Sequence, residues 1–190
     1  MLWTDPVTLL SVLWVGGELL LIARRRPGEA DSKGADRGSF GVLMVVMWTG
    51  IGAGVWMGMS GIGRLPGGVF VPMHYAGAAL IAAGLAIRWT AIRTLGRFFT
   101  VKVTLREDHR VIKDGLYRHI RHPSYTGVLL SIVGLAVSFA SWASLVAIVV
   151  PVFSAMAYRI HVEEAALVAG LGDEYREYQR TTSRLVPGVY

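Results

Sequence analysis

Long apolar segments alternate with shorter polar ones along this chain, and the alternation predicts membrane-spanning helices. A helix that crosses the hydrocarbon core of a bilayer needs about 20 predominantly apolar residues, with a range of about 17–25. Five segments approach that length, at residues 7–23, 40–60, 72–92, 123–140 and 142–160. The pattern therefore predicts an all-α polytopic membrane bundle of about five transmembrane helices.

The last two segments are expected to form a helical hairpin, because only Ser141 separates them. Pro123 suits the first turn of the earlier helix, where the missing N–H of a proline costs nothing. Pro151 lies in the middle of the later helix and should kink it. Such a short turn returns the chain to the level of Pro123, so polar residues near the two open ends should be neighbours.

Composition agrees with a membrane protein and excludes several other classes. Hydrophobic residues make up 53% and charged residues 17% of the 190 positions, which excludes a disordered or fibrous chain. The chain has no cysteine, which excludes disulfides, structural cysteine–zinc sites and thiol catalysis. A net charge of +6 would favour nucleic acid as a partner if the protein were soluble. Here the basic residues flank apolar segments, so the charge indicates membrane topology and no nucleic acid is expected.

Most arginine and lysine residues fall on one side of the predicted membrane; the exceptions are Arg64, in the predicted external loop, and Arg88, near the end of the third span. Five lie at residues 24–37, and twelve more lie at residues 93–121 and 159–184. By the positive-inside rule, the N-terminus is outside and the C-terminus is cytosolic. The first segment is expected to be a membrane anchor and not a signal peptide, because an arginine triplet follows it in place of a cleavage site.

Small and acidic residues inside the predicted spans suggest how the helices pack. Gly50, Gly54 and Gly58 recur at four-residue spacing, which favours close approach of another membrane helix. Glu18 lies inside the first span, where an ionised carboxylate is costly unless it has a partner. It is expected to pair with a basic residue such as Arg88, to face a polar cavity or to be protonated. A structural role and a role on a substrate path both remain open.

Most polar groups that could do chemistry lie at residues 94–121 and 163–190. Residues 108–117 and the run Arg-His-Pro-Ser-Tyr at 121–125 bring histidines, tyrosines and cations to the start of the fourth span. A helix N-terminus can hold an anionic group there, whereas a basic loop touching anionic lipid head groups is the alternative. Arg159 and Glu163 share one helix face, either as a solvated pair or on two sides of a polar pocket.

These motifs occur in a specific order along the C-terminal half, from Gly96 on. The matching positions are Val111-Ile112-x-x-Gly115-x-Tyr117, Arg121-His122-Pro123-Ser124-Tyr125-x-Gly127, Glu163-Glu164, Gly172-Asp173-Glu174-Tyr175-x-x-Tyr178 and Arg184-x-x-Pro187. The set resembles the isoprenylcysteine carboxyl methyltransferase family, and the phospholipid methyltransferases share two of its elements. We therefore expect residues 1–93 to be a three-span membrane region and residues 94–190 to be a methyltransferase core.

The resemblance implies an enzyme that uses S-adenosylmethionine, releases S-adenosylhomocysteine and holds the cofactor in a cytosolic pocket. The implied cofactor contacts are His109, Arg110, Val111, Ile112, Tyr117, His122, Pro123, Ser124, Tyr125 and Glu163, with Lys102 as a weaker match. Arg159 corresponds to the arginine that positions the substrate carboxylate in the family, so it is the implied catalytic and substrate-binding residue. No metal is expected, because methyl transfer requires none and no cluster has the spacing of a metal site.

The methyl acceptor stays open at the level of sequence. A lipophilic, lipid-anchored acceptor with the carboxylate of a prenylcysteine is the first choice, since a cation such as Arg159 would orient it. A phospholipid amine or a small thiol would need a base, for which His122 and Glu163 are nearest. The alternatives from other classes are an NADPH-dependent reductase of the sterol-reductase kind and a non-enzymatic protein that binds lipid head groups.

Overall fold

Helices make up almost all of the regular structure in the computed structural model, which describes residues 5–23, 38–100 and 110–190. The helices are α1 (Pro6–Ala23), α2 (Ser39–Met59), α3 (Phe70–Leu95), α4 (Pro123–Ser138), α5 (Trp142–Leu171) and α6 (Asp173–Thr181). Short 3-10 turns lie at η2 (Gly67–Val69), η3 (Gly96–Phe98) and η4 (Gly115–Arg118). Across the described ranges, β-pairing is limited to two isolated bridges. The predicted all-α class is confirmed.

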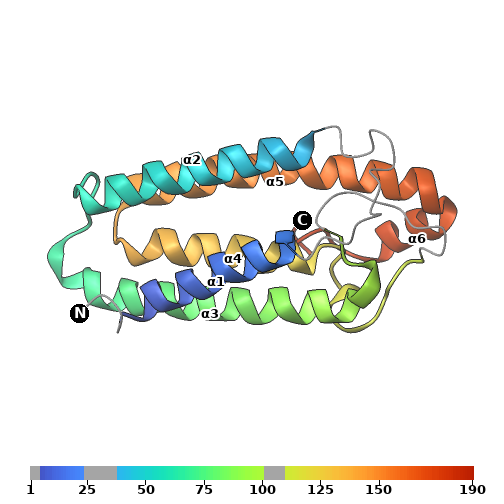
Figure 1. Ribbon diagram of the computed structural model, residues 1–190, viewed down its shortest axis with the longest axis horizontal. Coiled ribbons are helices and arrows are strands. Elements are labelled where there is room, and N and C mark those ends of the chain that lie inside the picture. Colours follow the sequence, from blue (N-terminus) through green and yellow to red (C-terminus); the bar gives the residue numbers. More distant parts are fainter. Residues whose placement is uncertain (1–4, 24–37, 101–109) are drawn as a thin grey trace.

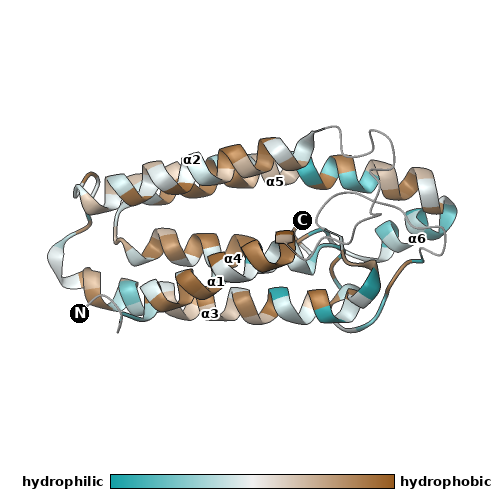
Figure 2. Ribbon diagram, in the orientation of Figure 1, coloured by the Kyte–Doolittle hydropathy of each residue, from teal (hydrophilic) through white to brown (hydrophobic). Residues whose placement is uncertain are grey.

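Membrane-spanning length is reached by α1, α2, α3 and α5 among the described residues. The fourth apolar helix, α4, has 16 residues, so at about 1.5 Å per residue it is shorter than the hydrocarbon core of about 30 Å. Figure 2 shows apolar residues along these helices and more hydrophilic ones toward the end that carries α6. The chain is therefore a multi-pass membrane protein, as predicted.

Two groups of helices form the bundle (Figure 1). In one group α2 and α5 lie side by side, and in the other α1 and α4 pack on α3. The hairpin partners α4 and α5 connect the groups. The α2–α3 and α4–α5 connections lie at one end of the bundle, together with the start of α1, and α6 lies at the opposite end.

Glycines bring α3 and α4 into backbone contact at two levels. A Cβ atom placed on Gly77 would lie 2.5 Å from the carbonyl oxygen of Gly134, and one on Gly127 would lie 2.6 Å from that of Gly84. Side chains do not tolerate such distances, so this crossing requires glycine on both helices. Because the two helices lie so close, the start of α4 is positioned directly against α3.

The predicted glycine stripe on α2 faces α5 and the turn that precedes it. A Cβ atom on Gly58 would lie 2.5 Å from the ring of Phe139, and one on Gly54 would overlap the side chain of Ile148. Gly50 is looser, with 3.3 Å to the carbonyl oxygen of Ala147. The expected packing role of these three glycines is confirmed.

The turn between α4 and α5 is as tight as predicted. Ser141 caps α5 by accepting a hydrogen bond from the N–H of Ser144 at 3.1 Å, and its hydroxyl donates to the carbonyl oxygen of Ile62 at 2.7 Å. Ala140 takes a left-handed backbone conformation, with φ at 47°. The helix before this turn therefore stops at Ser138, two residues short of the predicted segment.

The last long helix extends beyond its apolar segment. The sequence predicts a span over residues 142–160, whereas α5 continues past Pro151 and ends at Leu171. Residues 161–171 are rich in alanine, leucine and glutamate, which favour helix, so the helix persists after the hydropathy falls. Gly172, with φ at 59°, then ends it. This extension carries Glu163 and Glu164 on a rigid helix and not in a separate polar segment.

Candidate active site

A cavity, called the central cavity below, lies between the two helix groups. Every α-helix from α1 to α6 contributes to its walls, together with η4. Its apolar part is lined by Trp14, Leu43, Met47, Val128 and Met156. Its polar part is lined by residues of the segment before α4, of α4 itself and of the later turns of α5. A polar site therefore continues into an apolar space between membrane helices.

The segment before α4 contributes one wall of the polar part. Arg110, Val111, Ile112 and Tyr117 all line the central cavity. The carbonyl oxygen of Tyr117 accepts a hydrogen bond from the hydroxyl of Tyr178 at 2.5 Å, which joins η4 to α6. Burial raises the pKa of the Tyr117 phenol, and the nearby Glu163 carboxylate adds to the effect, so this tyrosine stays neutral.

The first turn of α4 contributes a second wall. His122 precedes the helix, and its backbone N–H donates to the carbonyl oxygen of Arg184 at 3.0 Å. Pro123 occupies the first helical position as predicted, but it is buried beneath the cavity wall and does not line it. His122, Ser124 and Tyr125 do line the cavity.

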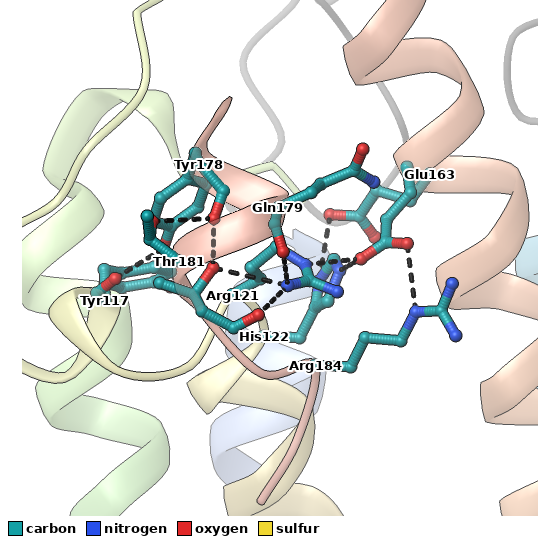
Figure 3. Close-up of polar contacts among 10 residues, drawn as sticks. Tyr117, Arg121, His122, Glu163, Tyr178, Gln179, Thr181 and Arg184 are labelled. Atoms are coloured by element: carbon teal, nitrogen blue, oxygen red, sulfur yellow. Dashed lines mark hydrogen bonds and ion pairs between the residues drawn. The ribbon is translucent and has the colours of Figure 1, made fainter. Parts of the chain in front are cut away.

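One buried carboxylate holds this region together. Glu164, only 4% exposed, accepts hydrogen bonds from Nε of Arg121 at 2.8 Å and from Nε of Arg184 at 3.0 Å. Nε2 of His122 lies 3.3 Å from the same carboxylate. Arg121 also donates to the carbonyl oxygens of Gln179 and Thr182 (Figure 3). Glu164 thus fastens the segment before α4 to α5 and to the C-terminal segment.

The neighbouring carboxylate points to the cavity. The hydroxyl of Tyr125 donates to Oε2 of Glu163 at 2.7 Å and accepts from Nε of Arg159 at 3.2 Å. Arg159 is only 1% exposed and also donates to the hydroxyl of Ser39 at 2.7 Å. The prediction that the two open ends of the hairpin are neighbours is confirmed, with Tyr125 between Arg159 and Glu163.

The structure thus gathers the described residues that the sequence singled out. Arg110, Val111, Ile112, Tyr117, His122, Ser124, Tyr125, Arg159 and Glu163 share the central cavity, and Pro123 is buried between two of them in the chain. Lys102 and His109 lie outside the described residues.

Sequence reasoning missed the contribution of the first two helices to the cavity. Trp14, Phe40 and Met47 line it, yet nothing in their spacing distinguishes them from lipid-facing residues. The sequence marks Glu18 as an intramembrane carboxylate, and the structure pairs it with Arg88, which the sequence suggests as a partner. Tyr175 and Tyr178 belong to the motif at residues 172–178, whose spacing indicates no role for them; both line the cavity from α6.

Comparison with known families and proteins agrees with the motifs. Residues 77–169 match the model of the isoprenylcysteine carboxyl methyltransferase family. Over 115 residues the chain is 40% identical to protein-S-isoprenylcysteine O-methyltransferase A of Arabidopsis thaliana and 38% identical to form B. Each alignment covers 60% of this chain and 58% of the relative, so this chain matches less than two thirds of those proteins. These matches confirm the resemblance that the sequence motifs indicated.

A solved structure shows the same fold over nearly the whole chain. It is that of a eukaryotic intramembrane Ras methyltransferase, isoprenylcysteine carboxyl methyltransferase, which superposes with a TM-score of 0.66. The superposition covers 96% of this chain and 65% of that protein, at 20% sequence identity. The helical arrangement of the membrane bundle is therefore shared beyond the region in which the sequences align.

Proposed function

We propose that this chain, which matches the isoprenylcysteine carboxyl methyltransferase family over residues 77–169, is an integral membrane methyltransferase that uses S-adenosylmethionine. One observation carries the proposal: the motif residues from three separate segments line one cavity, and that cavity continues into an apolar space. A cofactor with charged and aromatic parts would occupy the polar portion, and a lipophilic acceptor would occupy the apolar portion.

The residues of the polar part fit S-adenosylmethionine, which combines a sulfonium, an amino-acid end and an adenosine. Glu163 offers a carboxylate for the ribose hydroxyls or the ammonium group, while Val111 and Ile112 offer apolar contacts to the adenine. Arg110 offers a cation for the cofactor carboxylate. When bound, the cofactor would supply a methyl group on positively charged sulfur. The residues named from the sequence remain proposals for these contacts, Lys102 and His109 among them.

We assign the acceptor end to Arg159. Its guanidinium lies against Tyr125 and Ser39 at the cavity, where a carboxylate could add a charge-assisted hydrogen bond. The relatives are named for S-isoprenylcysteine, so we propose the carboxylate of a prenylcysteine-like, lipid-anchored substrate. Trp14 and Met47 would contact its apolar tail, which enters sideways from the bilayer.

A carboxylate acceptor needs little acid–base help from the protein. It arrives ionised, so the chain has only to orient one of its oxygens in line with the methyl group, at about 3–3.5 Å. Arg159, which is buried, fixes the direction of the carboxylate, and the half-buried Tyr125 and Glu163 beside it limit the access of water. No side chain has to remove a proton in this scheme. An amine or a thiol, in contrast, would depend on His122 or Glu163 as a base.

The two regions of the chain would have different roles. We propose that residues 94–190 hold the cofactor and that residues 1–93 supply apolar walls for the acceptor. We also propose that the end of the bundle carrying α6 faces the cytosol and that the start of α1 lies outside. What supports this orientation is the basic excess on the connections at the α6 end.

Calorimetry and a transfer assay with the purified protein in detergent test the proposal. We expect S-adenosylhomocysteine to bind and NADPH not to bind, because the cavity offers partners for the amino-acid end of the former. Methyl transfer is then compared for a farnesylated cysteine derivative, a phosphatidylethanolamine and a small alkyl thiol. Transfer to the first supports the full proposal. Absence of S-adenosylhomocysteine binding would overturn it, and transfer to the soluble thiol alone would overturn the lipophilic acceptor.

A further inference from the structure

An ion pair inside the membrane region connects α1 to α3. Arg88 on α3 donates from Nη2 to Oε2 of Glu18 on α1 at 2.6 Å, and its Nε donates to Oε1 of the same carboxylate. The contact is therefore bidentate, the geometry in which an arginine binds a carboxylate most strongly. Arg88 is 9% exposed and the side chain of Glu18 is 24% exposed, so the arginine is buried and the carboxylate is half-buried.

The third nitrogen of the same guanidinium reaches α4. Nη1 of Arg88 donates to the hydroxyl of Ser124 at 2.6 Å. Ser124 is the second residue of α4, next to Pro123. The approach is close because a Cβ atom on Gly127 would lie 2.7 Å from the backbone nitrogen of Arg88. A single side chain thus joins α1, α3 and the first turn of α4.

This connection ends in the proposed cofactor site. Ser124 is followed by Tyr125, whose hydroxyl joins Glu163 and Arg159. Glu18, Arg88 and Ser124 all line the central cavity, so the contacts run along its wall. Displacement of the first turn of α4 would move Tyr125 relative to both of its partners on α5.

We infer that the Glu18–Arg88 pair positions the first turn of α4 for cofactor binding. Helix α1 then contributes to cofactor binding through Glu18. The inference rests on the proposed function, since it concerns the same cavity. Glu18 and Arg88 act as positioning residues through Ser124 and need no contact with the reacting atoms. Apolar residues would anchor α1 equally well, and an ionisable pair within a membrane span points to function before stability.

The same two helices offer a matched control at the other end of the bundle. Oδ1 of Asp5, just before α1, lies 2.6 Å from Nε2 of His74 on α3. Thirteen residues separate Asp5 from Glu18, so the two contacts are about 20 Å apart along the helix. Asp5→Asn removes the carboxylate from this contact, while asparagine can still cap α1 in place of the present contact to Thr8.

The test measures the dissociation constant of S-adenosylhomocysteine by calorimetry for the wild type, Glu18→Gln, Arg88→Lys and Asp5→Asn. We expect Glu18→Gln and Arg88→Lys to weaken binding about tenfold, or about 1.4 kcal/mol. Lysine keeps the charge but lacks the planar guanidinium, whose separate N–H groups bind Glu18 and Ser124 at the same time. Asp5→Asn should stay within about twofold of the wild type, because distant sites act independently.

A double-mutant cycle then separates positioning from general loosening of the bundle. If the effect runs through Ser124, adding Glu18→Gln to Ser124→Ala should weaken binding by less than about twofold further. Full additivity of the two substitutions would overturn the inference. An equal loss of S-adenosylhomocysteine affinity in Asp5→Asn would also overturn it, because loosening α1 at any point would then be enough to weaken binding.

Other outcomes distinguish this inference from the proposed function. Failure of the wild type to bind S-adenosylhomocysteine would overturn the proposed function, and the inference with it. Wild-type affinity in Glu18→Gln and Arg88→Lys would overturn the inference alone. Size-exclusion chromatography shows whether each variant is folded. If Glu18→Gln misfolds, the affinity of Arg88→Lys alone decides the outcome. Misfolding of both, with Asp5→Asn intact, would assign the pair to stability and overturn the inference.

Discussion

Two adjacent glutamates have different surroundings, and the difference separates stability from binding at the scale of single residues. Glu164 is buried among Arg121, His122 and Arg184 and faces away from the cavity lining. Glu163 lines the cavity and accepts one hydrogen bond from Tyr125. Neighbours on a helix point about 100° apart, so one of them supports the protein framework while the other meets the ligand.

Substitution of Glu164 by alanine is therefore expected to destabilise the fold. Arg121 and Arg184 would lose the carboxylate that pairs with them, and removing one member of a buried ion pair costs about 3–5 kcal/mol. Glu163→Gln should change stability little, because it alters only the hydrogen bond from Tyr125 and the 3.9 Å contact to Nδ1 of His122. It should weaken S-adenosylhomocysteine binding. Thermal unfolding in detergent and calorimetry measure the two effects. The assignment is wrong if Glu163→Gln unfolds as early as Glu164→Ala.

Substitution of Arg159 should affect methyl transfer more than cofactor binding. A charge-assisted hydrogen bond to an acceptor carboxylate is worth about 1.5–3 kcal/mol, so Arg159→Ala should lower methyl transfer about ten- to hundredfold. Cofactor affinity should stay nearly unchanged, because the lost contact is to the acceptor. Arg159→Lys should restore only part of the activity, since lysine lacks the bidentate fork. Full activity in Arg159→Ala would remove the carboxylate acceptor from the proposal.

At the scale of elements, the distance between α3 and α4 sets the position of the site. Gly84 on α3 faces the carbonyl oxygen of Gly127 on α4 at a distance that leaves no room for a side chain. Arg88 and Ser124 lie one turn farther along these same helices. Close packing therefore brings Arg88 within reach of the first turn of α4.

Gly84→Ala should separate these two helices. Overpacking of a tight contact costs about 1–3 kcal/mol, and the shift should also weaken S-adenosylhomocysteine binding. Gly52→Ala on α2 is the matched control, because nothing lies within 4 Å of a Cβ atom at that position. Thermal unfolding and calorimetry of both variants provide the comparison. Equal behaviour of the two variants would contradict the role of this crossing.

At the scale of the whole molecule, orientation in the membrane is the open prediction. The chain has no cysteine, so single cysteines can be introduced without a background signal. Gly67→Cys lies on the α2–α3 connection and Arg176→Cys on α6; both positions are exposed. A membrane-impermeant thiol reagent should label Gly67→Cys in intact cells and Arg176→Cys only after the cells are permeabilised. The reverse pattern would overturn the orientation and the cytosolic cofactor site.

Several features of this protein were determined by the sequence itself. Continuous apolar segments predicted the membrane helices, and the single residue between two of them predicted the hairpin. Glycine spacing predicted close packing of α2, and the order of the motifs predicted the similarity to isoprenylcysteine carboxyl methyltransferases. Each of these features depends on residues near each other in the chain, or on what one helix presents to lipid, so local pattern is sufficient to predict it.

Tertiary structure alone decided which residues meet. Glu18 and Arg88 are 70 positions apart, and Arg159 and Ser39 are 120 apart. It also decided that α1 and α2 line the cavity and that Glu163, and not Glu164, faces it. A pattern of hydropathy cannot distinguish a residue that faces lipid from one that faces an apolar cavity, because both surroundings favour the same side chains. Only the packing of the glycine-lined helices brings these distant residues together.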